Sequence, residues 1–303
     1  MIPKTIHYGW HSGSPQKAAI AFLARNCEKT LPVFLKRIER LRSYFADSRI
    51  FIVENDSIDA TRRLLKQYET SHESVILFSF DDPALDNLSR MERMACLRNK
   101  CLDLVENSGY EPDYYIVVDS DLDFSPASVC RALQNAPEDW AALFANGKYF
   151  LKFGMCRIPV LYYDLFAYLP DKVKIGRGDS LTQKQMLKLR WHTRREIKKN
   201  RYLKCRSAFG GLGIYRYDAV MGCHYAAERN VISRKFDQLC EHIPFHREVT
   251  KKGALYVCRD LKVYYEAISL RRWLTIWVKA HFRSRAFLKM QKVYRSLFTR
   301  GKR

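Results

Sequence analysis

Short apolar runs alternate with longer segments of helical character along the first part of the chain. The runs at 18–26, 49–55 and 74–80, and a fourth that begins at Tyr114, have the length of buried strands. Helices are expected between them, over 28–45, 59–68 and 88–105, and the first of these places its apolar residues three and four positions apart. This order predicts an α/β fold with a mixed, mostly parallel sheet flanked by helices. Ligands of such sheets bind beyond the carboxyl ends of the strands, so the polar residues that end these strands are expected to meet in one cleft.

The fourth run ends in carboxylates at every second position, Asp119, Asp121 and Asp123. Side chains two positions apart on a strand share a face, so Asp119 and Asp121 are expected to point the same way, roughly 7 Å apart. Carboxylates that close repel one another unless a cation lies between them. Hard oxygen ligands of this kind suit Mg2+ or Mn2+, which leave coordination positions for substrate phosphates. The strand end is therefore a candidate metal and diphosphate site.

Other interpretations of this strand end stay open to different degrees. The aspartates can simply be polar residues that terminate a strand. A calcium loop requires Gly and later Glu at fixed positions, which Phe124 and Cys130 occupy here, so that interpretation fails. A phosphohydrolase with Asp119 as its nucleophile also begins with a strand and D-x-D. Its motif normally lies near the start of the domain, however, whereas 118 residues precede Asp119.

Three segments, FIVENDSIDATRRLL, RMACLRNKCLDLV and VVDSDLD, resemble in this order the nucleotide-sugar half of GT-A fold glycosyltransferases. The chain is most similar to the fungal capsule-associated mannosyltransferase group and to related bacterial capsule or lipopolysaccharide glycosyltransferases. Further blocks that resemble this group are ANG at 145–147, YYDLFAY at 162–168, SAFGGLGIY at 207–215 and CEHIPFH at 240–246. The resemblance covers roughly residues 18–262. The resemblance implies a GT-A (Rossmann-like) fold and a hexosyltransferase that depends on Mn2+ or Mg2+. The implied donor is a nucleotide sugar, and the implied acceptor is a cell-surface glycan of the capsule, lipopolysaccharide or related polysaccharide class.

Candidate donor-binding residues follow the second strand and lie on the third helix. Glu54 and Asp56 can accept hydrogen bonds from a base or a ribose, or can instead cap the following helix, a role that also suits Ser57. Arg98 can form a two-pronged pair with a diphosphate, or can pair with a neighbour such as Glu92. The resemblance favours nucleotide binding for Glu54, Asp56 and Arg98 and adds Arg90, with Asp119 contacting both donor and metal.

Two adjacent glycines, Gly210 and Gly211, lie among apolar residues before an expected strand. Glycine at such a place indicates a bulge or a close approach of the backbone to a ligand, and a plain turn is the alternative. The resemblance favours contact with the donor or acceptor sugar.

A short helix is expected after the glycines, with Glu241 near its beginning and Pro244 in its first turn. His242 and His246 would share one face of this helix because they are four positions apart. The resemblance implies that Glu241 acts as base on the acceptor hydroxyl or contacts the acceptor, and that His242 or His246 completes the metal site. Each histidine also fits a hydrogen-bonded core residue. Asp164 is a second candidate catalytic carboxylate, and the stereochemistry, the donor and the acceptor stay open.

Composition sets the size and the compartment of this chain. At 303 residues and 47% hydrophobic content, one substantial core is expected. We expect a GT-A domain at 1–264 with a basic insertion at about 171–206, followed by a basic amphipathic helical tail at 265–303. The nine cysteines form no C-x-x-C pair, and no run approaches the length of a membrane span, which predicts a reduced, cytoplasmic protein.

The net charge of +21 is concentrated in two segments. The stretch 171–206 holds 13 Lys or Arg against three acids, and 270–303 holds 11 and no acid, mixed with aromatic residues. A basic aromatic helix suits the surface of an anionic membrane, so a peripheral place on the inner face of the cytoplasmic membrane is one expectation, and a helix packed on the domain is the other. An anionic acceptor, either a lipid-linked diphosphate glycan or a phosphate-bearing polysaccharide, also fits. Nucleic-acid binding is the alternative from another class, but the sequence contains no recognisable nucleic-acid module, and no specific nucleic-acid partner is expected.

Overall fold

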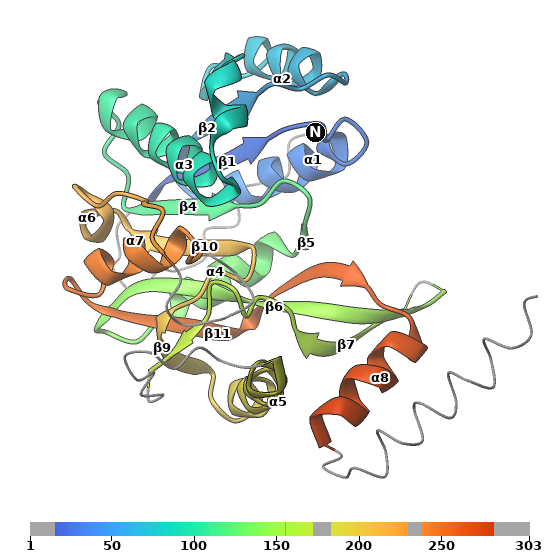
Figure 1. Ribbon diagram of the computed structural model, residues 1–303. Coiled ribbons are helices and arrows are strands. Elements are labelled where there is room, and N and C mark those ends of the chain that lie inside the picture. The colour runs from blue at the N-terminus through green and yellow to red at the C-terminus, as the bar shows by residue number, and fades with distance from the viewer. Residues whose placement is uncertain (1–15, 155, 172–182, 230–237, 282–303) are drawn as a thin grey trace, which may run out of the picture.

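The computed structural model describes residues 16–154, 156–171, 183–229 and 238–281. Its described strands join one mixed sheet in the order β3-β2-β1-β4-β10-β6-β11-β9-β8, with β5 paired to β11 and β7 paired to β6 (Figure 1). The elements of the first half are β1 (Lys17–Ala24), α1 (Leu31–Arg42), β2 (Asp47–Asn55), α2 (Thr61–Thr70), β3 (Val75–Phe80), a 3-10 turn (Pro83–Asn87), α3 (Arg90–Asn107), β4 (Tyr114–Val118), β5 (Asp123–Phe124) and α4 (Pro126–Gln134).

The first half of the sheet is parallel, because β2 pairs with both β1 and β3, and β1 pairs with β4, in parallel register. Strand β1 is buried on both faces. Its residues Ala18, Ile20 and Phe22 belong to the buried cluster that contains residues of α1, α2 and α4, while Ala19 and Ala21 belong to the cluster of α3 on the other face. Strands covered on both faces read as continuous apolar runs, which is why the sequence predicts them well.

The helices α1, α2 and α3 begin two or three residues after the expected starts at 28, 59 and 88. Ser89 and Glu92 form a capping box at the start of α3, so Glu92 bonds to Ser89 and not to Arg98. Helix α2 starts at Thr61 after the N-cap residue Ala60, and the Asp59 side chain accepts the Thr61 N–H at 2.9 Å. The prediction that Asp56 or Ser57 caps this helix is therefore wrong, since both residues lie in the preceding loop and bond elsewhere.

In the second half of the sheet, most neighbouring strands are antiparallel. Its elements are β6 (Trp140–Phe153), β7 (Cys156–Tyr162), β8 (Leu169–Pro170), α5 (Gln183–Lys199), β9 (Tyr202–Ser207), β10 (Leu212–Arg216), α6 (Tyr217–Val220), α7 (His242–Val249), β11 (Ala254–Ala267) and α8 (Leu270–His281). Strand β10 is antiparallel to β4 and β6, whereas the long strands β6 and β11 are parallel to each other. The prediction of a mixed α/β sheet with parallel strands and flanking helices is confirmed.

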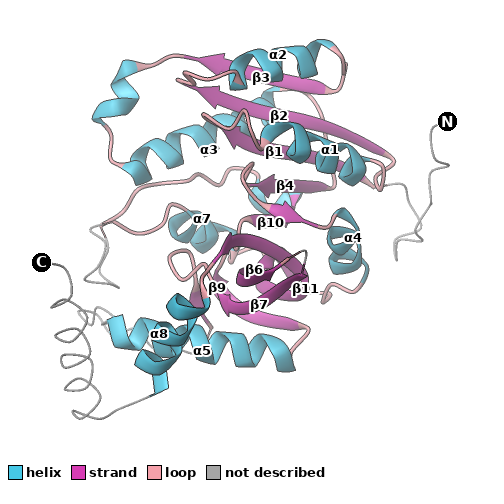
Figure 2. Ribbon diagram, turned by 90° about the vertical axis from the view of Figure 1, so that its right-hand side faces the viewer, coloured by secondary structure: helices cyan, strands magenta, loops and turns pink. Residues whose placement is uncertain are grey.

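The expected basic insertion and tail contain regular elements. Within 171–206, the structure describes α5 and most of β9, and β9 pairs with β11, so this segment contributes a strand to the main sheet. Strand β11 continues to Ala267, three residues past the expected boundary at 264, and α8 follows it. Figure 2 shows α5 and α8 together on the side of the molecule that also carries the β6–β7 hairpin. None of the helices in the described residues is both long enough and apolar enough to cross a bilayer.

Candidate active site

A cavity of about 540 Å³ lies at the carboxyl ends of β1 and β4, bordered by the start of α3, the segment after β7 and the start of α7. Its lining contains three arginines, which are Arg25, Arg90 and Arg98, and four carboxylates, which are Asp119, Asp121, Asp164 and Glu241. These residues are up to 216 positions apart in the sequence, as the spacing of Arg25 and Glu241 gives. A cavity that holds both signs of charge suits a ligand with a polyanionic part and a cation.

Asp119 and Asp121 follow β4 and both face this cavity. The backbone N–H of Asp119 donates to the carbonyl of Gly211 at 3.0 Å, which continues the pairing of β4 with β10 and fixes where the turn begins. The Asp119 side chain is 34% exposed, and that of Asp121 is exposed. Burial raises the pKa of Asp119 to about 7, with the negative charges of Asp121 and Glu241 acting in the same direction and Arg98 acting against it.

The donor chemistry of this pair fits a hard divalent cation. Among the described residues, no three His, Cys, Asp or Glu side chains lie together as a protein-only metal site. Mg2+ is commonly held by one or two carboxylates, with water and substrate phosphates as its other ligands, and Asp119 and Asp121 provide this smaller set.

Arg98 joins two of the cavity carboxylates. This buried side chain donates from Nε to Glu241 Oε1 at 3.0 Å and from Nη2 to Asp119 Oδ1 at 3.1 Å. Its guanidinium also lies over the ring of Phe209, 4.9 Å from the centroid. Burial opposes the positive charge, but Asp119 and Glu241 raise the pKa of Arg98 well above its ordinary value, so it stays a cation.

Glu241 and Asp164 are the other two carboxylates. Glu241 is the N-cap residue of α7, and its Oε2 accepts a hydrogen bond from the Cys240 thiol at 3.4 Å in addition to the bond from Arg98. Asp164 accepts backbone N–H bonds from Gly210 at 2.7 Å and from Ala167 at 3.2 Å. Burial raises the pKa of Asp164, and these two hydrogen bonds oppose the rise.

Gly210 and Gly211 do not belong to the cavity lining. The Gly210 N–H binds the Asp164 carboxylate, and the Gly211 carbonyl accepts the backbone N–H of Asp119. Their φ angles are +64° and +89°, in the left-handed region that favours glycine. A Cβ on Gly210 would lie 2.1 Å from the carbonyl oxygen of Ala145, and one on Gly211 would lie 2.0 Å from Leu122 Cδ1. The backbone at these two glycines therefore lies close to other residues of the protein, and not to the cavity where a ligand would bind.

His242 and His246 share one face of α7 as expected, with ring centroids 5.5 Å apart, but only His242 lines the cavity. The His242 ring stacks on Phe209 at 4.0 Å, and neither of its nitrogens has a hydrogen-bond partner among the described residues. Burial and Arg98 hold the pKa of His242 well below its ordinary value, so the ring is neutral. His246 is a core residue whose two nitrogens bond to Ser207 Oγ at 2.8 Å and Tyr215 OH at 2.9 Å.

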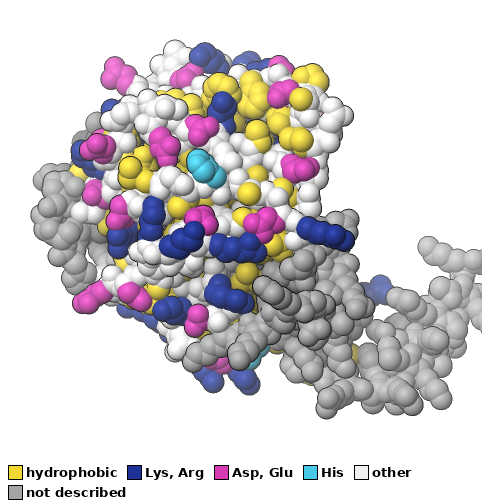
Figure 3. All heavy atoms as spheres, turned by 60° about the vertical axis from the view of Figure 1, so that its left-hand side comes forward, with side chains coloured by type: hydrophobic (Ala, Val, Ile, Leu, Met, Phe, Trp, Pro, Cys, Tyr) yellow, Lys and Arg dark blue, Asp and Glu magenta, His cyan; other side chains and the backbone are white. Residues whose placement is uncertain are grey.

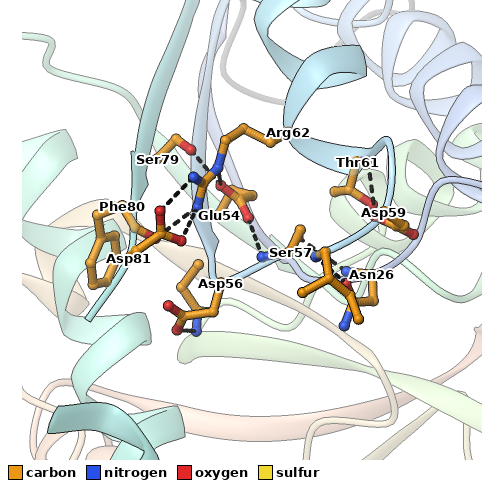
Figure 4. A network of polar contacts seen from close by, with 12 residues as sticks. Asn26, Glu54, Asp56, Ser57, Asp59, Thr61, Arg62, Ser79, Phe80 and Asp81 are labelled. Atoms are coloured by element: carbon orange, nitrogen blue, oxygen red, sulfur yellow. Dashed lines mark hydrogen bonds and ion pairs between the residues drawn. The ribbon is translucent and has the colours of Figure 1, made fainter. Parts of the chain in front are cut away.

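Glu54 and Asp56 do not line the cavity and instead brace the loop after β2 (Figure 4). The buried carboxylate of Glu54 accepts hydrogen bonds from the Ser57 N–H at 3.0 Å, from Arg62 Nε at 2.7 Å and from Ser79. Burial would raise the pKa of Glu54, but these bonds outweigh it and lower the pKa. Asp56, at φ +48°, accepts hydrogen bonds from the Asp82 N–H and from the Asn55 side chain.

Three tyrosines form an aromatic wall on the β6 and β11 side of the cavity. The rings of Tyr163 and Tyr265 are stacked, with centroids 4.4 Å apart and planes 9° apart. Tyr149 meets both rings edge-on at 6.0 and 5.8 Å. In the order of the sheet, this wall lies on the opposite side of β4 from β1 and Arg25.

The chain matches no protein-family model and no curated protein. Among solved structures it is similar to S. aureus TarS 1–349, with 14% identity over 88% of this chain and 67% of that one and a TM-score of 0.45. It is also similar to the mannosyltransferase PcManGT from Pyrobaculum calidifontis in complex with GDP-Man and Mn2+, with 10% identity, 91% and 65% coverage and a TM-score of 0.48. GalNAc-T7 with UDP, GalNAc and Mn2+ gives 10% identity, 84% and 44% coverage and a TM-score of 0.45. The chain thus spans less than two thirds of the last two structures, and these distant similarities assign no chemistry to it.

Sequence reasoning missed the aromatic wall and Arg25. Arg25 directly follows β1, so the rule that strand ends carry ligand-binding residues is a signal that could have found it. Tyr163 is next to the candidate Asp164 in the YYD block. Tyr149 and Tyr265 lie inside two long strands, and only the parallel pairing of β6 with β11 brings them together.

Proposed function

We propose that this chain is a metal-dependent glycosyltransferase of the GT-A class, which moves a sugar from a nucleotide-sugar donor to a cell-surface glycan acceptor. One observation carries the proposal: separate blocks of the resemblance meet at a single cavity. Asp119 and Asp121 come from VVDSDLD, Arg98 from RMACLRNKCLDLV, Asp164 from YYDLFAY and Glu241 from CEHIPFH. Chance similarity of short segments gives no reason for their side chains to converge on one cavity.

The polar side of the cavity suits the donor diphosphate. Arg25 and Arg90 present guanidinium groups near the strand ends, and guanidinium forks match the geometry of phosphate oxygens. Asp119 and Asp121 would hold Mn2+ or Mg2+, which when bound would neutralise the charge that develops on the leaving diphosphate. Arg98 keeps Asp119 oriented toward this position through its bond to Oδ1.

Proton transfer from the acceptor hydroxyl, in an inverting reaction, requires a carboxylate in the same cavity. Asp164 and Glu241 both meet this requirement, and they differ in environment. Burial raises the pKa of Asp164, which favours its uptake of a proton, whereas Glu241 forms a buried ion pair with the cationic Arg98. We therefore assign the base to Asp164 and assign to Glu241 the orientation of Arg98 and contact with the acceptor.

The acceptor sugar is proposed to lie against the aromatic wall of Tyr149, Tyr163 and Tyr265. Aromatic rings offer a flat apolar face, and the apolar face of a pyranose ring packs well against such a surface. This wall is separated from Arg25 by β4 in the sheet, so the donor nucleotide and the acceptor would approach Asp119 from opposite sides.

The test is thermal unfolding of the full chain with UDP-sugars and GDP-sugars, each with and without Mn2+. A donor at about 100 times its Kd stabilises the folded state by about 2.7 kcal/mol, which raises the Tm of a chain of this size by about 4 °C. We expect such a shift for at least one donor with Mn2+, and none in Asp121→Ala. Asp139→Ala is the matched control, because Asp139 is an exposed carboxylate outside the cavity, and this variant should retain the shift.

Two outcomes would contradict the proposal. The first is the absence of a shift with every donor tested in the presence of Mn2+. The second is turnover of a generic phosphate ester that is lost in Asp119→Asn, which would favour a phosphohydrolase with Asp119 as its nucleophile.

A further inference from the structure

Helix α8 covers only part of an apolar surface. Its residues Trp273 and Ile276 pack against the cluster formed by Leu151, Val160, Leu161 and Ile268, which belongs mainly to the β6–β7 hairpin. Figure 1 shows α8 lying beside that hairpin. Leu270 and Leu274 are one turn apart on the neighbouring stripe of the helix and are 49% and 45% exposed.

The hairpin continues the same apolar face beyond α8. Leu151 is paired with Ile158, and Phe153 with Cys156, so these four side chains share one face of the two strands. Leu151 is buried under α8 and α5, whereas Phe153 and Ile158 are 54% and 49% exposed. Phe153 and Ile158 of the hairpin and Leu270 and Leu274 of α8, together called here the α8 face, are thus apolar residues open to solvent on two elements that pack together.

Basic side chains accompany the α8 face. Lys152 and Arg271 are exposed, and Arg272 is exposed while it pairs with Glu266 at 3.2 Å. Helix α8 contains no acidic residue. On the side of α3 and α6, in contrast, acidic and basic side chains are interspersed (Figure 3). Exposed leucines flanked by arginine and lysine are the arrangement of interfacial helices, whose apolar residues enter the boundary of a bilayer while the basic residues attract anionic lipids.

We infer that the α8 face docks on the surface of an anionic lipid bilayer. Phe153, Ile158, Leu270 and Leu274 enter the boundary between head groups and acyl chains, and Lys152 and Arg271 contact lipid phosphates. Because two separate elements provide the apolar contacts, they determine the orientation of the molecule on the bilayer as well as its affinity for the bilayer. Nucleic-acid phosphates would use the basic side chains but give no reason for the exposed apolar strip.

The α8 face adjoins the candidate active site. Tyr149 lines the cavity and also packs against the same hairpin cluster as Trp273, and Arg272 lies over the Tyr149 ring, 5.7 Å from the centroid. A docked molecule therefore presents the aromatic wall near the bilayer. If the proposed function holds, on which this one consequence rests, the acceptor is carried by a lipid.

The experiment is co-sedimentation of the full chain with vesicles of phosphatidylcholine, and with vesicles of phosphatidylcholine and phosphatidylglycerol in about equal parts, at about 0.1 M salt. We expect binding to the anionic vesicles and little binding to the neutral ones. Leu270→Gln/Leu274→Gln and Phe153→Gln/Ile158→Gln should each lower the partition coefficient at least about ten-fold. The assay contains no nucleotide sugar, so its result is independent of the transferase proposal.

The matched control is Val33→Gln/Met221→Gln, which removes two apolar side chains that are each 52% exposed elsewhere on the molecule. This variant should bind vesicles as the unchanged chain does. Lys152→Glu/Arg271→Glu alters charge and leaves the apolar residues in place, and it should lower binding at least about thirty-fold. All variants change exposed residues, and unchanged thermal unfolding checks that they fold.

Three results would overturn the inference. The unchanged chain could bind both kinds of vesicle equally weakly. The hairpin variant could bind as well as the unchanged chain. The α8 variant could lose affinity for a short DNA duplex to the same extent as for vesicles, which would identify a nucleic-acid surface instead.

Discussion

Removal of the Arg98 guanidinium tests the central contact of the candidate site. Arg98 and Glu241 are both 4% exposed and are 3.0 Å apart, so Arg98→Met leaves a buried carboxylate without its cation. An uncompensated buried charge costs about 3–5 kcal/mol of the free energy of unfolding. The second partner, Asp119, adds little to this loss, because its pKa is already raised to about 7 and it can take up a proton when Arg98 is absent.

A double-mutant cycle isolates this interaction. Arg98→Met, Glu241→Gln and the double variant are compared with the unchanged chain by urea unfolding at pH 7. In the Glu241→Gln background, the loss of Arg98 leaves no buried charge at position 241. We therefore expect the double variant to lose about 2 kcal/mol less unfolding free energy than the two single variants lose together. Losses that add to within about 0.5 kcal/mol would refute the reasoning.

An exposed ion pair provides the control for this cycle. Arg216 and Asp218 are neighbours in sequence and are 37% and 64% exposed. Arg216→Met should therefore cost less than about 1 kcal/mol. A comparable loss at both sites would mean that burial is not the cause of the large effect at Arg98.

Three further predictions follow from individual residues. Burial lowers the pKa of Lys148 from 10.5 to about 7, and the positive charges of Arg194, Lys262 and Lys198 act in the same direction. Between about pH 7 and pH 10.5 the folded state therefore binds fewer protons than the unfolded state, so the free energy of unfolding rises with pH. Lys148→Met lacks this rise, and urea unfolding at several pH values should find it more stable at neutral pH by up to about 5 kcal/mol, an advantage that shrinks toward pH 10. Gly211→Ala should lower the free energy of unfolding by at least about 2 kcal/mol, because the new Cβ meets Leu122. Gly109→Ala, at φ +63° with no atom within 4 Å of the new Cβ, should lower it only by the backbone strain of about 1 kcal/mol. Equal losses of stability in the two variants would contradict this. Asp164→Asn should lower the rate of sugar transfer at least about 100-fold while the Mn2+-dependent donor shift in Tm persists, and an unchanged rate would remove Asp164 as the base.

Residues whose environment is set by their own strand or helix were predicted well. The apolar runs of the parallel strands and the shared face of His242 and His246 follow from local spacing. The place of Asp119 at the cavity agrees with the rule that ligands bind at strand ends, whereas Arg98, Glu241 and Asp164 were named only through the resemblance.

Residues whose environment depends on distant partners were not predictable in this way. Glu54 is followed by a helix, and its sequence neighbourhood fits a ligand contact, yet Arg62 and Ser79 occupy its oxygens. His242 and His246 are equivalent in the sequence, but Ser207 and Tyr215 engage only His246. The partner of Arg98 is Glu241, 143 positions away, and not the nearby Glu92.

The sequence by itself determined the alternation of strands and helices, the carboxylates at the end of β4 and the basic character of the last helix, because each depends on spacing within a few turns or residues. Only the tertiary structure decided the antiparallel half of the sheet, the aromatic wall and the pairing of Arg98. These features depend on which of many chemically similar side chains come into contact across the sheet. That choice is made by the packing of the whole core, to which residues far apart in the chain contribute together.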